Sequence, residues 1–380
     1  MNDLLYIVDQ PALNDFCAGL RGVSWLALDT EFIREQTYYP QLCLIQIASA
    51  DRVACIDPLA LPSLDPLLDL LYDPAITKVL HAAQQDLEIF YHLRGAVPTP
   101  VFDTQLAALV LGHGSQIGYA ALVQQLLGVE LDKTHTRANW RHRPLAPEWL
   151  AYAAADVRYL RELYPRQQAA LAARGWLDAL AEDFAALAVP DRYRLQPWEA
   201  WRRIREHNRL RGVQRAVLRT LAAWREERAS THDRPRRWIL DDAALFELAR
   251  RMPKTPDELS RIRSLPATTV QRQGEALLAR IATARAEPPE QWPARISRSH
   301  FSPEQAAKVG EMLGLIAACA DRYCIPSQSL ADRWHVEKLL LGEDSPLLHG
   351  WRAAVIGRDL LARLIADANS PRPDRYSHGQ

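Results

Sequence analysis

The sequence lacks several features that would assign it to a particular class of protein. No stretch approaches the roughly 18 uninterrupted apolar residues that span a bilayer. The N-terminus, MNDLLYIVDQPALNDF, has neither a basic flank nor a small-residue cleavage site, so we expect no signal peptide. Five cysteines without a CxxC pair argue against a disulfide framework or a zinc site, and for a reducing compartment. We therefore expect a cytoplasmic protein that does not bind membranes.

A phosphate-binding loop of the form GxxxxGK[ST] is also missing, which excludes a helicase motor and any nucleoside triphosphate bound in that way. What is present is an ordinary globular composition, with 48% hydrophobic and 24% charged residues. A chain of 380 residues is long enough for several domains with buried cores.

The net charge of zero conceals an uneven distribution along the chain. Residues 1–190 contain 13 Lys and Arg against 22 Asp and Glu, whereas residues 191–300 contain 24 against 14. Nearly all the cations of the second region are arginines. This division suggests that the first part holds metal ions and the second part contacts a polyanion, although solvated helix surface is the simpler explanation for the arginines.

The hydrophobic pattern predicts an α/β domain followed by helices. Three short apolar runs over about residues 25–57 predict a strand meander, and helical spacing then alternates with a strand-like run at 78–83. A long helix is expected from Pro147 to about Leu171. Strands followed by alternating strands and helices predict a mixed sheet within residues 1–190.

Beyond that domain the pattern is helical. An irregular, Pro-containing linker is expected around residues 186–200. Two helical bundles are then predicted at 205–287 and 300–370, separated by a second Pro-rich break, and residues 371–380 are expected to form a flexible tail.

Four acidic residues lie at the edges of predicted elements. Asp29 and Glu31 are two residues apart at the end of a strand, so both side chains project to the same side. Asp86 begins a predicted helix, and Tyr152 precedes Asp156 by one helical turn. Each residue alone would be an ordinary cap or turn residue. Together they form a set of hard oxygen ligands that suits Mg²⁺ or Mn²⁺.

The segments around these residues resemble the three exonuclease motifs of the DEDD superfamily. They are LDTEF at 28–32, HAAQQDLEIF at 81–90 and YAAADVRYL at 152–160. The spacing of Tyr152 and Asp156 is typical of the tyrosine subgroup. Residues 131–160 are similar to ribonuclease D in particular, and the resemblance covers about residues 5–170. In one departure, His81 and Gln85 occupy the region where the second motif often has an asparagine.

The resemblance implies a ribonuclease H-like mixed-sheet exonuclease domain and a 3′→5′ exoribonuclease that acts on tRNA precursors. It also implies two divalent cations, Mg²⁺ or Mn²⁺, that activate a water and stabilise the leaving oxygen. Asp29 would bridge the two ions. Glu31 and Asp156 would hold the ion that carries the water, Asp86 would serve the other ion, and Tyr152 would orient the water.

A basic stretch before the third motif is the predicted RNA contact. Its candidates, together with the more weakly supported Phe32 and Gln46, are Lys133, Thr134, Arg137, Trp140, Arg141, His142 and Arg143. The alternative is a surface loop anchored by a buried Trp140. We expect His81 to be structural. Asp103 fits a helix cap better than a fifth ligand, although the resemblance keeps it as a support for the metal site.

The helical half is similar to two copies of the helicase-and-RNase-D C-terminal (HRDC) domain, the second of them degenerate. Its first part contains arginines that could contact RNA phosphates: Arg202, Arg203, Arg209, Arg211, Arg215 and Arg219.

Three other functions remain open from the sequence. They are a DNA 3′→5′ exonuclease of the same superfamily, a non-catalytic nucleic-acid-binding scaffold and an accessory subunit of a helicase.

Overall fold

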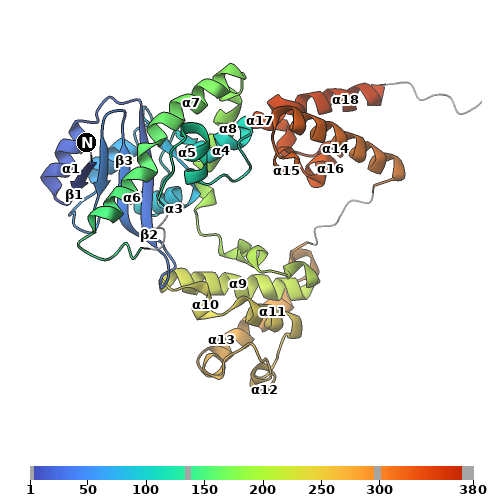
Figure 1. The fold of residues 1–380 in the computed structure, drawn as a ribbon. Helices are drawn as coiled ribbons and strands as arrows, with labels where there is room; N and C mark the ends of the chain where they lie inside the picture. The colour runs from blue at the N-terminus through green and yellow to red at the C-terminus, as the bar shows by residue number, and fades with distance from the viewer. Residues whose placement is uncertain (1–3, 133–137, 295–300, 370–380) are drawn as a thin grey trace, which may run out of the picture. The chain divides into compact units, whose positions relative to one another are not determined.

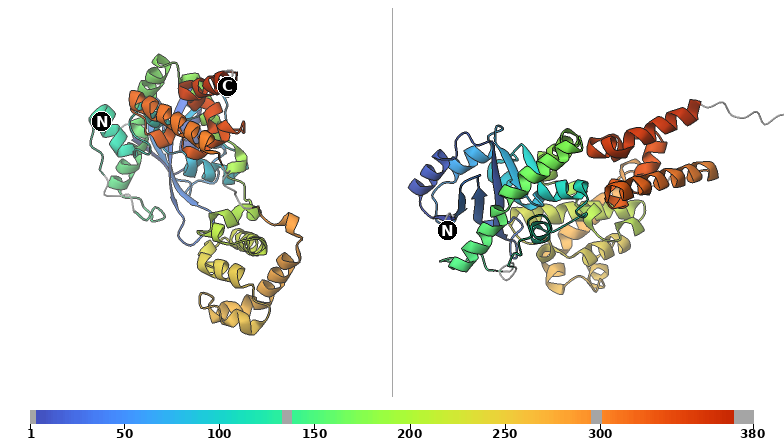
Figure 2. Two further views of the ribbon diagram at one scale, coloured as in Figure 1. Left: turned by 90° about the vertical axis from the view of Figure 1, so that its right-hand side faces the viewer. Right: turned by 45° about the horizontal axis from the view of Figure 1, so that its top comes forward.

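The computed structural model describes residues 4–132, 138–294 and 301–369. The described residues form two compact units, each with helices and an apolar core (Figures 1 and 2). The first unit consists of residues 4–32, 42–132, 138–193 and 301–369, and the second of 33–41 and 194–294. The predicted tail at 371–380 lies outside the described residues.

One mixed sheet forms the centre of the first unit. Its strands are ordered β1–β4–β3–β2–β5–β6. The pairs β1–β4, β2–β5 and β5–β6 are parallel, and β3–β4 is antiparallel. The bounds are β1 Leu4–Ile7, β2 Trp25–Ile33, β3 Gln41–Ala48, β4 Val53–Ile56, β5 Thr77–Leu80 and β6 Val101–Asp103. The predicted mixed sheet is confirmed. The sequence pattern did not predict β1 and β6.

The two faces of the sheet are covered by different helices. Alternate residues of β2 and β3, such as Leu28 and Ile45, join α1–α3 in the main apolar core. Because side chains alternate along a strand, Asp29 and Glu31 project to the other face. Cys55 of β4 also projects there, and its Sγ lies 3.7 Å from the carbonyl oxygen of Leu150 in α6. We call this second face the α6 face; it is the face on which the predicted acidic residues meet.

The helices of this part of the first unit differ from the predicted pattern in two ways: the long helix expected from Pro147 is divided, and α1 and α8 were not predicted. They are α1 Gln10–Ala18, α2 Asp65–Leu71, α3 Gln84–Arg94, α4 Thr104–Leu111, α5 Tyr119–Leu127, α6 Pro147–Arg158, α7 Leu160–Ala173 and α8 Leu177–Leu187, with a 3₁₀ turn at Pro190–Arg192. The long helix predicted from Pro147 to about Leu171 is two helices that meet at Tyr159. The first lies against β4, whereas the second packs mainly against α4.

The C-terminal helices of the first unit pack on its α/β part. Trp351 is fully buried, and its backbone N–H donates to the carboxylate of Asp183 in α8 at 3.1 Å. Trp176 meets Tyr323 edge to face at 4.8 Å between ring centroids. These helices are α14 Pro303–Tyr323, α15 Ser327–Leu330, α16 Arg333–Leu340, α17 Gly350–Arg352 and α18 Arg358–Asn369, with a 3₁₀ turn at Pro346–Leu348 and a π-helical turn at Ala353–Gly357.

The second unit is a small helical bundle, as predicted. Its core includes the buried side chains of Trp201, Leu221 and Leu277. The helices are α9 Val213–Thr231, α10 Arg236–Ile239, α11 Asp242–Arg251, α12 Pro256–Ser260 and α13 Ala267–Ala286, with 3₁₀ turns at Pro197–Arg203, His207–Arg209 and Pro289–Gln291.

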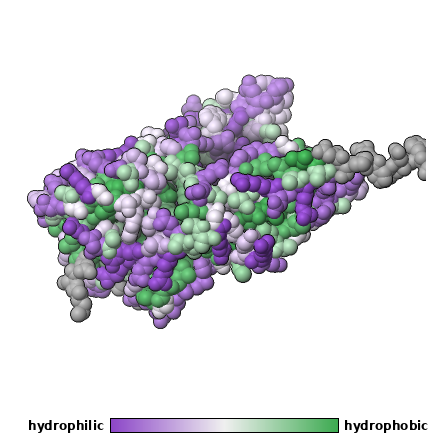
Figure 3. Space-filling model, turned by 90° about the horizontal axis from the view of Figure 1, so that it is seen from above, coloured by the Kyte–Doolittle hydropathy of each residue, from purple (hydrophilic) through white to green (hydrophobic). Residues whose placement is uncertain are grey.

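The surface carries both hydrophobic and hydrophilic residues. Hydrophobic residues are interspersed among hydrophilic ones on the face drawn in Figure 3. Among the described residues, no helix combines the length and the apolar composition required to cross a bilayer.

Candidate active site

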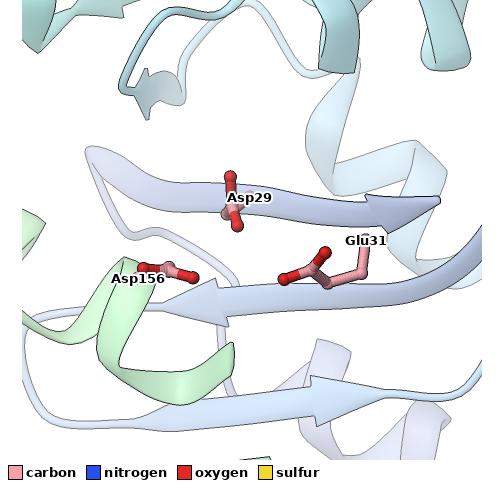
Figure 4. Close-up of side chains that lie close together, drawn as sticks. All are labelled: Asp29, Glu31 and Asp156. Atoms are coloured by element: carbon pink, nitrogen blue, oxygen red, sulfur yellow. The ribbon is translucent and has the colours of Figure 1, made fainter. Parts of the chain in front are cut away.

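Three carboxylates meet on the α6 face of the sheet. Asp29 and Glu31 come from β2, and Asp156 comes from α6. Each offers one oxygen, and these oxygens lie within 4.8 Å of one another (Figure 4). All three side chains are partly exposed, so an ion can reach them from solvent. We call this group the carboxylate cluster.

The surroundings of the cluster disfavour negative charge on its carboxyl groups. Burial, followed by the charges of Asp86, Asp156 and Glu31, raises the pKa of Asp29 well above its ordinary value. Burial and the charges of Asp156 and Asp86 raise the pKa of Glu31 to about 8. Burial raises the pKa of Asp156 to about 7. A cation bound among these oxygens would relieve the repulsion, so the residues fit a divalent ion.

Asp86 lies beside the cluster but is held differently. It is buried in the first turn of α3, and its carboxylate accepts a hydrogen bond from the hydroxyl of Thr30 at 2.5 Å. Burial raises its pKa to about 7 against the opposing effect of this hydrogen bond. The structure therefore brings three of the four predicted acids together and places the fourth within electrostatic range of Asp29 and Glu31.

Asp103 is a helix cap, as the residue pattern predicted. Its carboxylate accepts hydrogen bonds from the backbone N–H groups of Gln105 and Leu106 at the start of α4. It also accepts from Ala82 and Ala83 at 3.1 and 2.9 Å, in the turn that leads into α3. Asp103 thus supports the helix that carries Asp86 without joining the carboxylate cluster.

Tyr152 lies one turn before Asp156 on α6, and its ring is backed by Trp140. The two ring centroids are 6.2 Å apart, and Trp140 also meets Trp149 edge to face at 5.7 Å. Trp140 is only 3% exposed. A buried ring has no open face for a nucleotide base, so here Trp140 serves as an anchor, and its predicted stacking on RNA stays a prediction.

The other predicted RNA contacts differ in their placement. Lys133, Thr134 and Arg137 lie outside the described residues. Arg141 is exposed and Phe32 is partly exposed. Arg143 is turned inward, where it forms an ion pair with the buried Asp57. The basic stretch is therefore not one uniform RNA-facing surface.

Two further side chains behave as structural residues. The ring nitrogens of His81 contact the Thr104 hydroxyl at 2.9 Å and the Ile117 carbonyl oxygen at 3.0 Å, in keeping with the expected structural role. Gln46 is fully buried in β3, and neither atom of its amide has a hydrogen-bond partner among the described residues.

Sequence reasoning did not identify two residues that hold this site. Thr30 appeared only as the spacer between two acids, yet its hydroxyl binds Asp86. Tyr119 donates its hydroxyl to the carbonyl oxygen of Ala155 at 2.9 Å, next to Asp156. Both contacts join positions at least 36 residues apart, so no local pattern signals them.

In the second unit most of the candidate arginines already have partners. Arg202, Arg209 and Arg219 form ion pairs with nearby glutamates at 2.5–3.0 Å. Arg215 is 4% exposed, and its Nε donates to the Leu210 carbonyl oxygen, so its predicted contact with RNA is not supported. Arg203 and Arg209 each have 69% of the side chain exposed, and Arg203 lies 3.8 Å from the Glu226 carboxylate.

Comparisons with known proteins agree with these features. Residues 5–171 match the family described as 3′-5′ exonuclease, and residues 214–281 match the HRDC domain. The chain is 40% identical to a ribonuclease D of Gluconacetobacter diazotrophicus, over 90% of this chain and 88% of that protein. It is 36% identical to a ribonuclease D of Pseudomonas paraeruginosa, over 95% of this chain and 98% of that protein.

A solved structure supports the similarity over the whole length. The crystal structure of Escherichia coli RNase D, described as an exoribonuclease involved in structured RNA processing, superposes with a TM-score of 0.84. The identity is 33%, and the match covers 97% of this chain and 99% of that one. The similarity therefore includes the helical regions as well as the sheet.

Proposed function

The chain belongs to the ribonuclease D family of 3′→5′ exoribonucleases, and from this premise we propose that it trims tRNA precursors and other structured RNAs from their 3′ ends. The products would be 5′-mononucleotides, and the reaction would require two divalent cations, Mg²⁺ or Mn²⁺. The HRDC match supports RNA binding by the helical part. Five unpaired cysteines are in keeping with a cytoplasmic enzyme.

The observation that carries the proposal is the carboxylate cluster. Asp29, Glu31 and Asp156 would supply oxygen ligands, and Asp86 would complete the set directly or through a water. When bound, two divalent cations would lower the pKa of the attacking water and stabilise the leaving 3′ oxygen. The raised pKa values support this assignment, because burial and then mutual repulsion disfavour the ionised carboxylates until positive charge is added.

Tyr152 is the proposed orienting group. Burial and the charges of Asp156, Glu31 and Asp29 raise the pKa of its phenol above the ordinary value of 10.0. The hydroxyl is then neutral near pH 7, so it can hold the attacking water by a hydrogen bond but is a poor proton acceptor. Asp29, Glu31, Asp86, Tyr152 and Asp156 are thus the proposed catalytic set.

RNA binding is proposed at two places. Near the cluster, Phe32 and Arg141 remain candidates on the surface, with Lys133 and Arg137 in the same basic stretch. The stacking predicted for Trp140 would require its buried ring to become exposed. In the helical part, Arg203 and Arg209 are open candidates, each with 69% of the side chain exposed. Contacts of this kind would bind phosphate without reading sequence. We also propose domains at 1–190, 205–287 and 300–370.

Nucleotide release from a 3′-extended tRNA transcript tests the proposal. The assay would use Mg²⁺ or Mn²⁺, beside a DNA strand of the same sequence. We expect stepwise release of 5′-monophosphates from the RNA and loss of release with EDTA. Release from DNA alone would instead assign a DNA exonuclease, because only the 2′-hydroxyl distinguishes the substrates. Metal binding without release from either strand would indicate a nucleic-acid-binding scaffold.

A further inference from the structure

Arg143 makes five hydrogen bonds, as many as its guanidinium has N–H groups. Nε and Nη2 donate to the two carboxylate oxygens of Asp57 at 2.5 and 2.8 Å. Nη1 donates to the carbonyl oxygens of Trp140 and His142 at 2.7 and 2.8 Å, and Nη2 donates to that of Cys43 at 2.7 Å. A phosphate could bind this guanidinium only by displacing one of these acceptors.

The partner of Arg143 is itself fixed to the sheet. Only 2% of the Asp57 side chain is exposed, directly after β4. Its carboxylate also accepts from the Tyr6 hydroxyl of β1 at 2.9 Å and from the Leu59 backbone at 3.0 Å. Bidentate, charge-assisted hydrogen bonds of this kind are geometrically specific. Arg143 therefore joins β1, β3 and β4 to the turn at residues 138–142.

That turn carries the ring that lies behind Tyr152. The Arg143 guanidinium holds the Trp140 carbonyl oxygen, and the buried Trp140 indole packs near the Tyr152 ring. A shift of the turn would move the indole, and Tyr152 would lose the wall that limits its ring positions. Catalytic groups lose rate steeply when their support loosens, even where the support never touches the substrate.

We propose that Arg143, held by Asp57, is a positioning residue that fixes the Tyr152 ring through the turn at residues 138–142 and does not contact RNA. This inference rests on the proposed role of Tyr152 in the nuclease reaction. It reverses the expectation that every cation of the basic stretch faces the substrate.

The test is a double-mutant cycle in the full-length protein with Mn²⁺. Single-turnover cleavage of a short 5′-labelled oligoribonucleotide would be measured for the wild type, Arg143→Lys, Tyr152→Phe and the double variant. We expect Arg143→Lys to lower the rate about 10- to 100-fold with KM changed less than about 2-fold. In the Tyr152→Phe background the same change should cost less than about 3-fold, because the group being positioned is gone.

Arg174→Lys is the matched control. Arg174 also donates to backbone carbonyls, those of Val110 and Leu111, and its guanidinium lies over the Trp176 ring. Its replacement should lower thermal stability without changing the cleavage rate beyond about 2-fold in either Tyr152 background. If Arg143→Lys does not fold, Tyr6→Phe removes one hydrogen bond from Asp57 and should show the same dependence on Tyr152, at about 2- to 5-fold.

Three results would overturn the proposal. Equal loss from Arg143→Lys in both Tyr152 backgrounds would indicate general destabilisation. A raised KM with an unchanged rate, together with a weaker salt dependence, would make Arg143 a phosphate contact. A wild-type rate for Arg143→Lys would remove it from the mechanism. A wild-type protein that releases no nucleotide would instead count against the proposed function, so the two failures are distinguishable.

Discussion

The carboxylates on the α6 face of the sheet fall into two groups whose pKa values are shifted in opposite directions. The buried Asp57 accepts hydrogen bonds from Arg143, Tyr6 and a backbone N–H. Although burial raises its pKa, these partners lower it below the ordinary value. In the carboxylate cluster, burial raises the pKa values of all three members, and acidic neighbours raise those of Asp29 and Glu31 further.

The second unit also contains a buried carboxylate that, like Asp57, accepts several hydrogen bonds. Glu226 is 2% exposed, and its two oxygens accept from Arg236 at 2.6 Å each and from the Tyr38 hydroxyl at 2.6 Å. Burial raises the pKa of Glu226, but these partners lower it overall. Asp57 and Glu226, which stabilise the fold, therefore both have hydrogen-bond donors as partners. The acids of the cluster repel one another, and under the proposed function a bound cation would offset that repulsion.

Loss of a cluster acid should affect activity and stability in opposite directions. We expect Asp29→Asn to lower the cleavage rate at least about 10³-fold, roughly 4 kcal/mol of activation free energy. In EDTA the same variant should be more stable than the wild type by roughly 1 kcal/mol, because one repelled carboxylate is gone. Single-turnover kinetics and urea unfolding would measure the two effects.

Asp15→Asn, at an exposed position in α1, is the control for Asp29→Asn and should change neither quantity appreciably. A less stable Asp29→Asn protein in EDTA would contradict the view that the cluster is strained without metal.

Loss of the orienting phenol should be milder. Tyr152→Phe keeps the ring against Trp140 and removes only the hydroxyl, so we expect a residual rate about 10- to 100-fold below the wild type with KM nearly unchanged. Tyr72→Phe is a remote control, because the Tyr72 hydroxyl donates to the Phe90 carbonyl oxygen at 2.7 Å, away from the cluster. A loss equal to that of Asp29→Asn would make Tyr152 an obligatory base.

Removal of the charge of Glu226, which is paired with Arg236, should destabilise the second unit. We expect Glu226→Gln to cost about 3 kcal/mol in the second unit, because Arg236, whose side chain is 33% exposed, would lose its counter-charge. Hydrogen exchange of the α9 backbone amides would report the loss locally. The exposed neighbour Glu227→Gln should cost less than about 0.5 kcal/mol. Equal costs for both would mean that the buried pair contributes little.

The pH dependence of metal stabilisation should be the smallest of these effects. The folded pKa of Glu31 is about 8, above the ordinary 4.5, so the metal-free protein retains protons that the unfolded chain releases. The stability that this group contributes is therefore present below about pH 4.5 and lost as the pH rises towards 8. A divalent cation offsets that loss.

We expect the rise in Tm on adding Mn²⁺ to be small at pH 6 and to reach several degrees at pH 8. Thermal melts in Mn²⁺ and in EDTA across this range would measure it. The dependence on pH should be weaker in Asp29→Asn. A rise in Tm that does not change between pH 6 and 8 would argue against protonated cluster acids.

The sequence by itself determined the parts of the molecule that depend on neighbouring residues. Strand alternation put Asp29 and Glu31 on one side of β2, and helical spacing put Tyr152 and Asp156 on one side of α6. The capping role of Asp103 was also readable, because an aspartate before an apolar helical run has few other uses. These are local relations, set by the repeats of strand and helix.

The tertiary structure alone decided which distant groups meet. It brought Asp156 to β2, gave Asp86 the Thr30 hydroxyl, buried Trp140 and Arg215, and paired Arg143 with the buried Asp57. It also packed the last helices against α8. A periodic pattern shows that a side chain faces inward or outward, but not what it meets there. Strand order and helix packing decide that, because they join residues dozens of positions apart in the chain.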